Sequence, residues 1–494
     1  MSNSIHQRTR QWRRLHRHLT VALLTSSSII SQCCFVQTAR AQTTAYCQLS
    51  NDAIAQKENL RISALKGSSD SDKRYKALVK QHAESLRQCR SRTWPNTQAI
   101  WLRLYPCDAR SGAIDDILDR LVNRGYNQVN VEVFYDGQVL LPMSDNPTVW
   151  PSVVRTPGTE KIDLLAQFIQ KGHERGMRVY AWMYTMNFGY SYAQRPDRQK
   201  VLVRNGKGET SLSFVPDGSQ VFIDPYNMQA KTDYYQMVQA VLKRRPDGIL
   251  FDYIRYPRGS GSESVAARVE DLWVYSDAAK QALYDRALNR KGRELIQRYI
   301  SKGSINASDL ATVNQLYPEE ETPLWQGRTP SSTDSLASLQ WQLWQLSVAH
   351  AAQGILDFLN LATLPAKRNG IKAGAVFFPD GNQAVGQVGY DSRLQPWDRF
   401  PSSLEWHPMS YGVCGTTKCI DDLVKRVVNR ASPGTQVIPA LAGDWARSVS
   451  NRPPLEVQMR ALRQEVPQIS SVSHFAYSWQ DPSFDRDRKF CRLQ

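Results

Sequence analysis

Along most of the chain, short apolar runs alternate with longer segments in which apolar residues recur every three or four positions. The short runs predict β-strands, and the longer pattern predicts amphipathic helices. Helices are expected over 111–124, 161–175 and 231–244. Strands are expected over 99–105, 129–134, 178–184, 248–254, 371–378, 404–409, 436–441 and 472–477. Strands and helices that alternate in this order predict a parallel α/β fold.

This alternation favours a (β/α)8 TIM barrel with long loop insertions over residues 96–494. The largest insertions are expected near 187–230 and 258–365. A doubly wound sheet is the alternative fold. It is disfavoured because no glycine-rich phosphate-binding turn follows the first expected strand.

Residues 42–95 have a different pattern, which predicts a small N-terminal helical hairpin. Its helices are expected over 51–66 and 71–88, with a Gly-Ser-Ser-Asp turn between them. Cys47 and Cys89 lie near the two open ends, so a disulfide between them would close the hairpin. Each helix has one apolar face. That face either docks on the barrel or on another copy of the chain, or the hairpin is only an exported spacer.

Residues 1–41 have the basic, apolar and small-residue regions of a secretory signal peptide, with cleavage expected between Ala41 and Gln42. A membrane anchor is the alternative, but serine, threonine and glutamine residues interrupt the apolar run. A lipoprotein acylated at Cys33 is disfavoured because Gln32 stands where that signal has a small residue. We therefore expect a periplasmic or secreted protein.

The composition is that of a globular protein, with 41% hydrophobic and 22% charged residues. The formal net charge is +16, and loss of residues 1–41 removes six arginines and no acidic residue, which leaves +10. Such a charge would attract acidic polymers. Basic residues mostly alternate with acidic ones, however, so we expect a solvated basic surface and no nucleic-acid partner. No membrane span is expected after signal cleavage, since no apolar stretch is long enough.

Six cysteines follow the signal region, and an even number in an exported protein predicts disulfides. Cys414 and Cys419 bracket a short loop after the sixth strand. Cys107 follows the first strand and Cys491 lies near the chain end, so their pairing would close the barrel where its first and last elements meet. A free Cys107 is the alternative. The histidines are scattered, so we expect neither a metal site nor another cofactor.

The most specific segment is 247–257, in which an apolar strand delivers Asp252, Tyr253 and Arg255 at its carboxyl end. This Asp-Tyr-Ile-Arg-Tyr-Pro sequence resembles the glycosyl hydrolase-like family 10, a predicted TIM-barrel group that includes many bacterial exported proteins. Segments 125–127, 139–144, 173–182, 223–225 and 408–411 agree with it. The resemblance covers roughly 97–480 and is strongest up to Pro257. It implies a carbohydrate-active barrel in which Asp252 is the nucleophile or base.

Barrel enzymes hold their catalytic residues at the carboxyl ends of the strands. Carboxylates and aromatic side chains gather at the expected strand ends, and the second strand contributes Asn130 and Glu132. Glycosidic cleavage needs two carboxyl groups, and aromatic faces bind sugar rings. The catalytic candidates are Asp252, Asp380 as first choice for the acid/base partner, and Glu405, with Asp444 behind them. The substrate-binding candidates are Arg255, Tyr253, Trp182, Tyr184, His407, Tyr411, Asp444 and Trp479.

Each candidate also has a structural interpretation. Asp252 would be a buried partner of Arg255; if it is catalytic, the same cation would lower its pKa. Asp380 lies in an ordinary Asp-Gly-Asn turn, and Glu405 would pair with His407 or Arg255. The aromatic side chains would simply plug the barrel.

The sequence thus predicts an exported glycoside hydrolase acting on a polysaccharide or oligosaccharide, by a retaining or an inverting mechanism. One alternative is a barrel that binds glycans without cleaving them. Another is an envelope interaction protein whose hairpin docks a partner. The oligomeric state is left open.

Overall fold

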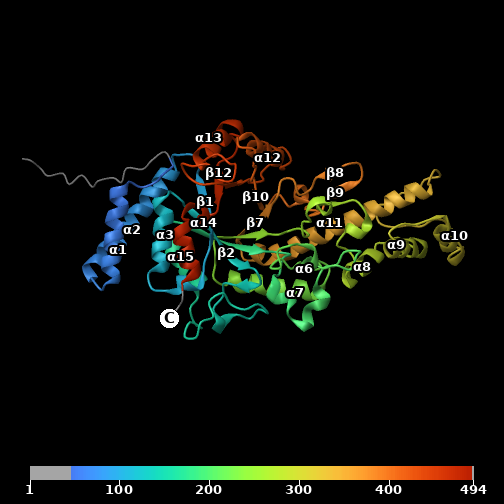
Figure 1. Cartoon of the computed structure of the whole chain (residues 1–494), viewed down its shortest axis with the longest axis horizontal. Helices are drawn as coiled ribbons and strands as arrows, with labels where there is room; N and C mark the ends of the chain where they lie inside the picture. Colours follow the sequence, from blue (N-terminus) through green and yellow to red (C-terminus); the bar gives the residue numbers. More distant parts are fainter. Residues whose placement is uncertain (1–45, 492–494) are drawn as a thin grey trace, which may run out of the picture. The chain divides into compact units, whose positions relative to one another are not determined.

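The computed structural model describes residues 46–491 of the chain (Figure 1). The predicted signal peptide and its cleavage between Ala41 and Gln42 lie outside these residues. None of the helices between residues 46 and 491 is both long and apolar enough to cross a membrane.

Eight parallel strands form a closed ring. They are hydrogen-bonded in the order β10-β7-β5-β4-β2-β1-β12-β11. The ring closes between β10 and β11, where the Ser410 N–H donates to the Ala440 carbonyl at 2.9 Å and the Ile438 N–H donates to the Trp406 carbonyl at 2.8 Å. The strands are β1 Thr97–Arg103, β2 Gln128–Tyr135, β4 Arg178–Tyr184, β5 Gly248–Asp252, β7 Lys372–Phe377, β10 Glu405–Pro408, β11 Ala440–Ala442 and β12 Ser471–Phe475. The predicted (β/α)8 barrel is confirmed, and a doubly wound sheet is excluded.

Helices connect most consecutive strands on the outside of this ring (Figure 1). The connection from β7 to β10 has only a short 3-10 turn, Trp397–Arg399, and two short strands in place of a helix. The barrel helices are α3 Ala113–Asn123, α4 Leu164–Glu174, α7 Met228–Leu242, α11 Leu336–Arg368, α12 Lys418–Val428 and α13 Leu455–Glu465, followed after β12 by α14 Tyr477–Gln480 and α15 Pro482–Phe490. The three helices expected from the sequence are therefore present, with ends shifted by a few residues.

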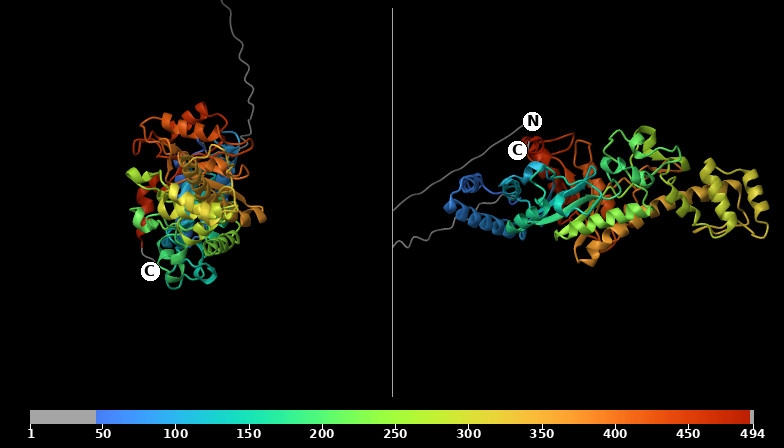
Figure 2. Two further views of the ribbon diagram at one scale, coloured as in Figure 1. Left: turned by 90° about the vertical axis from the view of Figure 1, so that its right-hand side faces the viewer. Right: turned by 90° about the horizontal axis from the view of Figure 1, so that it is seen from below.

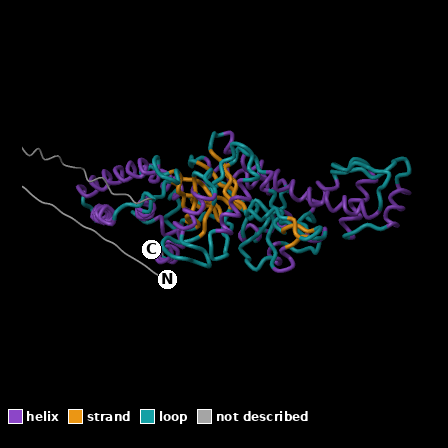
Figure 3. Tube along the Cα trace, turned by 90° about the horizontal axis from the view of Figure 1, so that it is seen from above, coloured by secondary structure: helices purple, strands orange, loops and turns teal. Residues whose placement is uncertain are grey.

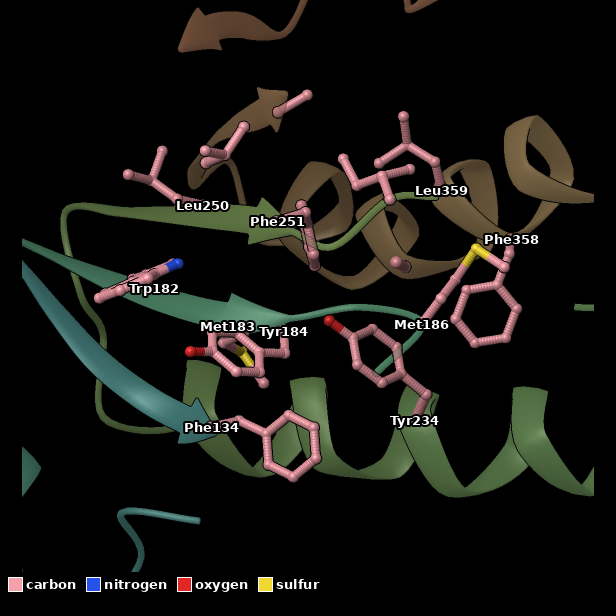
Figure 4. Close-up of a cluster of buried hydrophobic side chains, with 14 of the residues drawn as sticks. Phe134, Trp182, Met183, Tyr184, Met186, Tyr234, Leu250, Phe251, Phe358 and Leu359 are labelled. Carbon is pink, nitrogen blue, oxygen red and sulfur yellow. The ribbon is translucent and has the colours of Figure 1, made fainter. Parts of the chain in front are cut away.

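The hydrophobic core has one layer inside the barrel and one between the strands and the helices. In the outer layer, Tyr234 of α7 and Phe358 of α11 lie close to Met186 (Figure 4), and their ring centroids are 5.5 Å apart. Inside the barrel, the Trp101 ring meets the Trp182 ring edge-to-face at 4.9 Å. Successive residues of a strand point alternately into the barrel and toward the outer helices. Polar side chains that point inward therefore lie among packed side chains.

The longest insertion lies between β5 and β7. It holds α8 Asp277–Tyr284, α9 Arg290–Lys302 and α10 Ala307–Leu316, and α11 runs from it to the barrel (Figure 2). A small sheet, β6 Val265–Ala266, β9 Gly389–Asp391 and β8 Ala384–Val385, forms a second group of strands beside the barrel (Figure 3). Buried His350 of α11 fixes the insertion by accepting from Arg286 Nε at 2.8 Å and contacting the Ala279 carbonyl at 2.9 Å.

The expected insertion at 187–230 precedes α7. It contains α5 Tyr190–Ala193, the 3-10 turn Pro196–Val201 and α6 Ser211–Phe214. Outside this insertion, the short strand β3 Gln138–Val139 pairs with the end of β2. Asp224 at the end of the insertion accepts from Ser276 Oγ at 2.8 Å and from the Ala279 N–H at 3.0 Å. This aspartate therefore joins the two insertions.

The N-terminal hairpin, α1 Asn51–Leu65 and α2 Ser69–Arg90, docks on the outside of the barrel. Tyr75 of α2 donates to Asp119 Oδ2 of α3 at 2.7 Å and accepts from Arg175 Nη2 at 2.8 Å. Arg90 donates to the Gly125 carbonyl just before β2. Of the three roles left open by the sequence, docking on the barrel is the one observed.

Three disulfides join Cys47 to Cys89, Cys107 to Cys491, and Cys414 to Cys419. All three pairings suggested by the sequence are therefore present, and Cys107 is not free. The second bond links the segment after β1 to the end of α15, so it ties the first and last parts of the barrel together.

Candidate active site

The mouth of the barrel, which we define as the end formed by the carboxyl ends of its strands, contains Asp252. This residue ends β5, and its exposed fraction is only 6%. Its Oδ2 accepts from Trp182 Nε1 at 3.1 Å, and its Oδ1 accepts from the Tyr253 N–H at 2.6 Å. Tyr253 has a φ of 53°, a conformation that non-glycine residues rarely adopt. This turn brings the Tyr253 N–H onto the carboxylate of its neighbour.

The Asp252 carboxyl group holds its proton more tightly than an ordinary aspartate. Burial raises its pKa to about 6, although the Tyr253 N–H, the Arg255 charge and the Trp182 indole each lower it. The negative charge of Glu132 raises it further. Among residues 46–491, no carboxylate oxygen lies within 4.0 Å of the Arg255 guanidinium, so the ion pair considered from the sequence does not form. Burial therefore outweighs the cation.

A second buried carboxylate, Glu132, lies near the end of β2 with an exposed fraction of 1%. Arg103 of β1 contacts both of its oxygens, with Nη2 to Oε1 at 3.1 Å and Nε against Oε2. Burial raises the Glu132 pKa, while Arg103 and the Tyr184 hydroxyl lower it. The residue was visible in the sequence as a glutamate inside a Val-Asn-Val-Glu-Val strand, but it was not among the catalytic candidates.

A cavity of about 280 Å³ opens beside Glu132. Its wall combines aromatic and charged side chains from four strands and from the two helices that follow β12. The lining residues are Trp101, Leu102, Arg103, Tyr105, Glu132, Trp182, Tyr184, Phe475, Ala476, Ser478, Asp485 and Lys489. Glu132 lines the cavity directly, and Trp182 connects it to Asp252.

Aromatic rings follow one another around the mouth. Tyr253 lies 4.3 Å from Tyr184, which lies 5.9 Å from Trp182. Phe475 of β12 continues the series, with ring centroids 6.3 Å from Trp182, 5.4 Å from Tyr411 and 6.3 Å from Trp479. The structure thus joins five of the predicted substrate-binding aromatic residues in one series of ring contacts, two of which, Trp182 and Tyr253, also hydrogen-bond to Asp252. Phe475, which joins them, was not singled out in the sequence.

Glu405 and His407 lie away from this group. Glu405 is the first residue of β10, and it accepts from the Tyr180 hydroxyl at 3.2 Å and lies 3.7 Å from Lys372, the first residue of β7. These contacts are at the amino end of the barrel, opposite the mouth. His407 is fully buried in the interior, 3.4 Å from Glu405 and with its ring 6.3 Å from Trp101.

Asp380 and Asp444 follow strand ends but are occupied by other partners. Asp380 lies 3.1 Å from Arg393, and its side chain is 40% exposed. Asp444 accepts from the Trp445 N–H at 2.8 Å and pairs with Arg447. Within the described residues, neither shares a hydrogen bond with Asp252. Glu132 lines the cavity described above, whereas Asp380 and Asp444 do not.

The described part of the chain contains no group of three or more histidine, cysteine, aspartate or glutamate side chains arranged to hold a metal ion. The polar chemistry at the mouth is carried by carboxyl, guanidinium, hydroxyl and indole groups. Buried carboxyl groups with pKa values shifted toward neutrality are suited to proton transfer.

Comparison with known proteins adds to this geometry. Residues 96–307 match the family glycosyl hydrolase-like 10. The resemblance stated from the sequence is therefore confirmed over these residues, which run from β1 through β5 into the long insertion. The match to glycosyl hydrolase-like 10 includes Glu132, Trp182 and Asp252, and it ends well before the 480 expected from the sequence.

One curated relative is glycosyl hydrolase DigH from Escherichia coli O6:H1 (strain CFT073). It is 24% identical over 292 residues, which are 54% of this chain and 61% of that protein. The chain thus spans less than two thirds of the relative it matches.

Among solved structures, the PgaB (BpsB) glycoside hydrolase domain from Bordetella bronchiseptica is similar with a TM-score of 0.46 and 14% identity. The match covers 81% of this chain and 99% of that one. A catalytic mutant of the GH42 beta-galactosidase Gan42B from G. stearothermophilus has a TM-score of 0.47 and 12% identity, over 78% of this chain and 51% of that one.

Proposed function

We propose that this chain is a glycoside hydrolase whose active site is the barrel mouth around Asp252 and Glu132. The observation that supports it most is the Asp252 carboxyl group, buried at a strand end with a pKa of about 6. It accepts a hydrogen bond from Trp182, whose ring lines a cavity with other aromatic side chains. General acid–base catalysis works best when the pKa of the group lies near the working pH. The match to glycosyl hydrolase-like 10 supports the same chemistry.

In this proposal Asp252 is the general acid. Its protonated form donates to the glycosidic oxygen as the bond to the sugar breaks, and the Trp182 indole holds the carboxyl group in place. Glu132 supplies the second carboxylate. Its charge, balanced by Arg103, stabilises the positive charge that develops on the sugar ring or acts on it as nucleophile or base.

The substrate we propose is a polysaccharide or oligosaccharide. Aromatic faces at the mouth offer the apolar surfaces on which sugar rings stack. We also propose that the protein is exported to the periplasm or secreted. The three disulfides support this location, because disulfides persist in oxidising compartments.

The envelope interaction hypothesis loses its main support, since α3 of the same chain covers the hairpin face through Tyr75 and Asp119. The remaining alternative is a barrel that binds glycans without cleaving them. It predicts that binding survives removal of either carboxylate charge and that no bond is broken.

A panel of bacterial and plant polysaccharides tests the proposal by release of reducing ends. Wild type, Asp252→Asn and Glu132→Gln would be compared, with Glu405→Gln as a matched control that removes a buried carboxylate at the opposite end of the barrel. We expect release by wild type and Glu405→Gln, and at least about 100-fold less release by the other two. Glycan binding by all four proteins without release by any would favour the binding barrel.

A further inference from the structure

Arg255 lies three residues after Asp252, with an exposed fraction of 7%. Three aromatic rings surround its guanidinium carbon, with the Tyr253 centroid at 4.6 Å, Phe222 at 5.6 Å and Phe378 at 5.7 Å. The Tyr253 ring in turn contacts Tyr184, which lines the cavity. The guanidinium is therefore linked to the cavity wall through the rings of Tyr253 and Tyr184.

This buried cation has little polar compensation. Its Nη1 donates to the Tyr256 carbonyl at 3.0 Å, and its Nε is buried without a hydrogen-bond partner. Burial lowers the Arg255 pKa, because the charged form loses contact with water. Asp252, three residues before it, is more than 4.0 Å from the guanidinium and is held by Trp182 and Tyr253.

A neighbouring arginine shows what full compensation looks like. Arg393 packs over the same Phe378 ring at 4.7 Å. It pairs with Asp391 at 2.7 Å and with Asp380 at 3.1 Å. Two carboxylates thus form ion pairs with Arg393, and in the described part of the chain none lies within 4.0 Å of Arg255.

A buried cation is unfavourable unless an anion pairs with it, and aromatic faces offset only part of that penalty. The planar fork of a guanidinium suits a carboxylate, which it can bind through two parallel hydrogen bonds. We propose that Arg255 binds a carboxylate carried by the substrate, so that the glycan is an acidic one containing uronic acid or another carboxyl-bearing sugar. This inference rests on the proposed function for placing a glycan at the mouth. The net charge of +10 that remains after loss of residues 1–41 favours the approach of such a polymer.

Binding of matched ligand pairs tests this inference without requiring cleavage. Oligosaccharides of galacturonate, alginate and hyaluronan would each be compared with their methyl esters, which keep the sugar and remove the charge. Isothermal titration would be performed at low and high salt. We expect wild type to bind the acid of at least one pair at least about tenfold more tightly than its ester, with the preference weakened by salt.

The variant Arg255→Met keeps the apolar stem and removes the charge, while Arg255→Lys keeps the charge without the fork. We expect the first to abolish the preference for the acid and the second to reduce it. Arg74→Gln, an exposed arginine on the hairpin, controls for net charge and should keep the preference. Thermal unfolding is the second readout: Arg255→Met should unfold at or above the wild-type temperature, because it removes an unpaired buried charge.

The inference is overturned if no acid is preferred over its ester by wild type, or if Arg255→Met keeps the preference. Failure of the proposed function would look different. It would leave an acid preference that depends on Arg255, with no release of reducing ends from any polymer.

Discussion

Trp182 donates its indole N–H to Asp252 Oδ2 at 3.1 Å. The two residues face inward from neighbouring strands, β4 and β5, and the Trp182 ring is itself held edge-to-face against Trp101 at 4.9 Å. The tryptophan therefore has two roles in the proposed mechanism. It fixes the direction of the carboxyl group, and it stabilises the charged form that is left when the proton has been transferred.

Replacing Trp182 by phenylalanine keeps an aromatic ring and removes this donor. Because the indole lowers the Asp252 pKa, its loss should move the alkaline limb of the kcat/KM profile to higher pH. We also expect a roughly tenfold lower kcat, since the ionised carboxyl group loses a hydrogen bond. Steady-state kinetics across pH measures both effects. An alkaline limb that stays at its wild-type position would contradict the role given to the indole.

The pH dependence of the wild type follows from the same group. If Asp252 acts as an acid with a pKa of about 6, kcat/KM falls as the pH rises through that value. The slope of the limb should be close to one on a logarithmic plot, as for loss of a single proton. A profile that instead rises through about 6 would make Asp252 a base or nucleophile.

Stability provides an independent measure of the buried carboxyl group. The folded-state pKa of about 6 is above the unfolded value, so the stabilising contribution of the proton is present below about pH 4 and is lost as the pH rises through about 6. Asp252→Asn has no such loss. Relative to this variant, the wild-type free energy of unfolding should fall by roughly 1 kcal/mol between about pH 5 and about pH 8.

Urea unfolding of both proteins at the two pH values measures this difference. Groups that titrate in both proteins cancel in the comparison. If the two free energies of unfolding differ by the same amount at both pH values, burial does not raise the Asp252 pKa.

The hairpin makes a separate prediction. Tyr75→Phe removes a buried hydroxyl that joins Asp119 and Arg175, and should lower the free energy of unfolding by about 1–3 kcal/mol. Hydrolysis should be unchanged, because these contacts lie on the outer helices and not at the mouth. Urea titration alongside Arg74→Gln, whose effect should stay within about 0.5 kcal/mol, measures it. Equal stability of Tyr75→Phe and wild type would show that the hairpin is not fixed by this contact.

Much of the fold was predictable because hydrophobic periodicity and cysteine positions are properties of the sequence. The eight strands, the hairpin and the pairing of Cys47 with Cys89 follow from them. The position of each residue along the barrel axis was not predictable, because it depends on how far neighbouring strands are shifted relative to each other. Glu405 was expected near the rim, yet it begins its strand and meets Lys372 at the amino end.

The site was predictable only in part for a similar reason. Asp252 was a candidate because of its place at the end of an apolar strand and because of the family resemblance. Burial raises the pKa of this residue, and the sequence does not show how deeply a side chain is buried. The nearby Arg255 had instead suggested a lowered Asp252 pKa. Glu132 became a candidate only when the structure showed it paired with Arg103 in the wall of the cavity.

The central claim is that Asp252 takes part in breaking a glycosidic bond. Its most direct test is the rate at which purified wild type and Asp252→Asn release reducing ends from the same polymer, after circular dichroism has shown that both are folded. We expect release by the wild type and a loss of at least about 100-fold in the variant. Equal rates in the two folded proteins would contradict it.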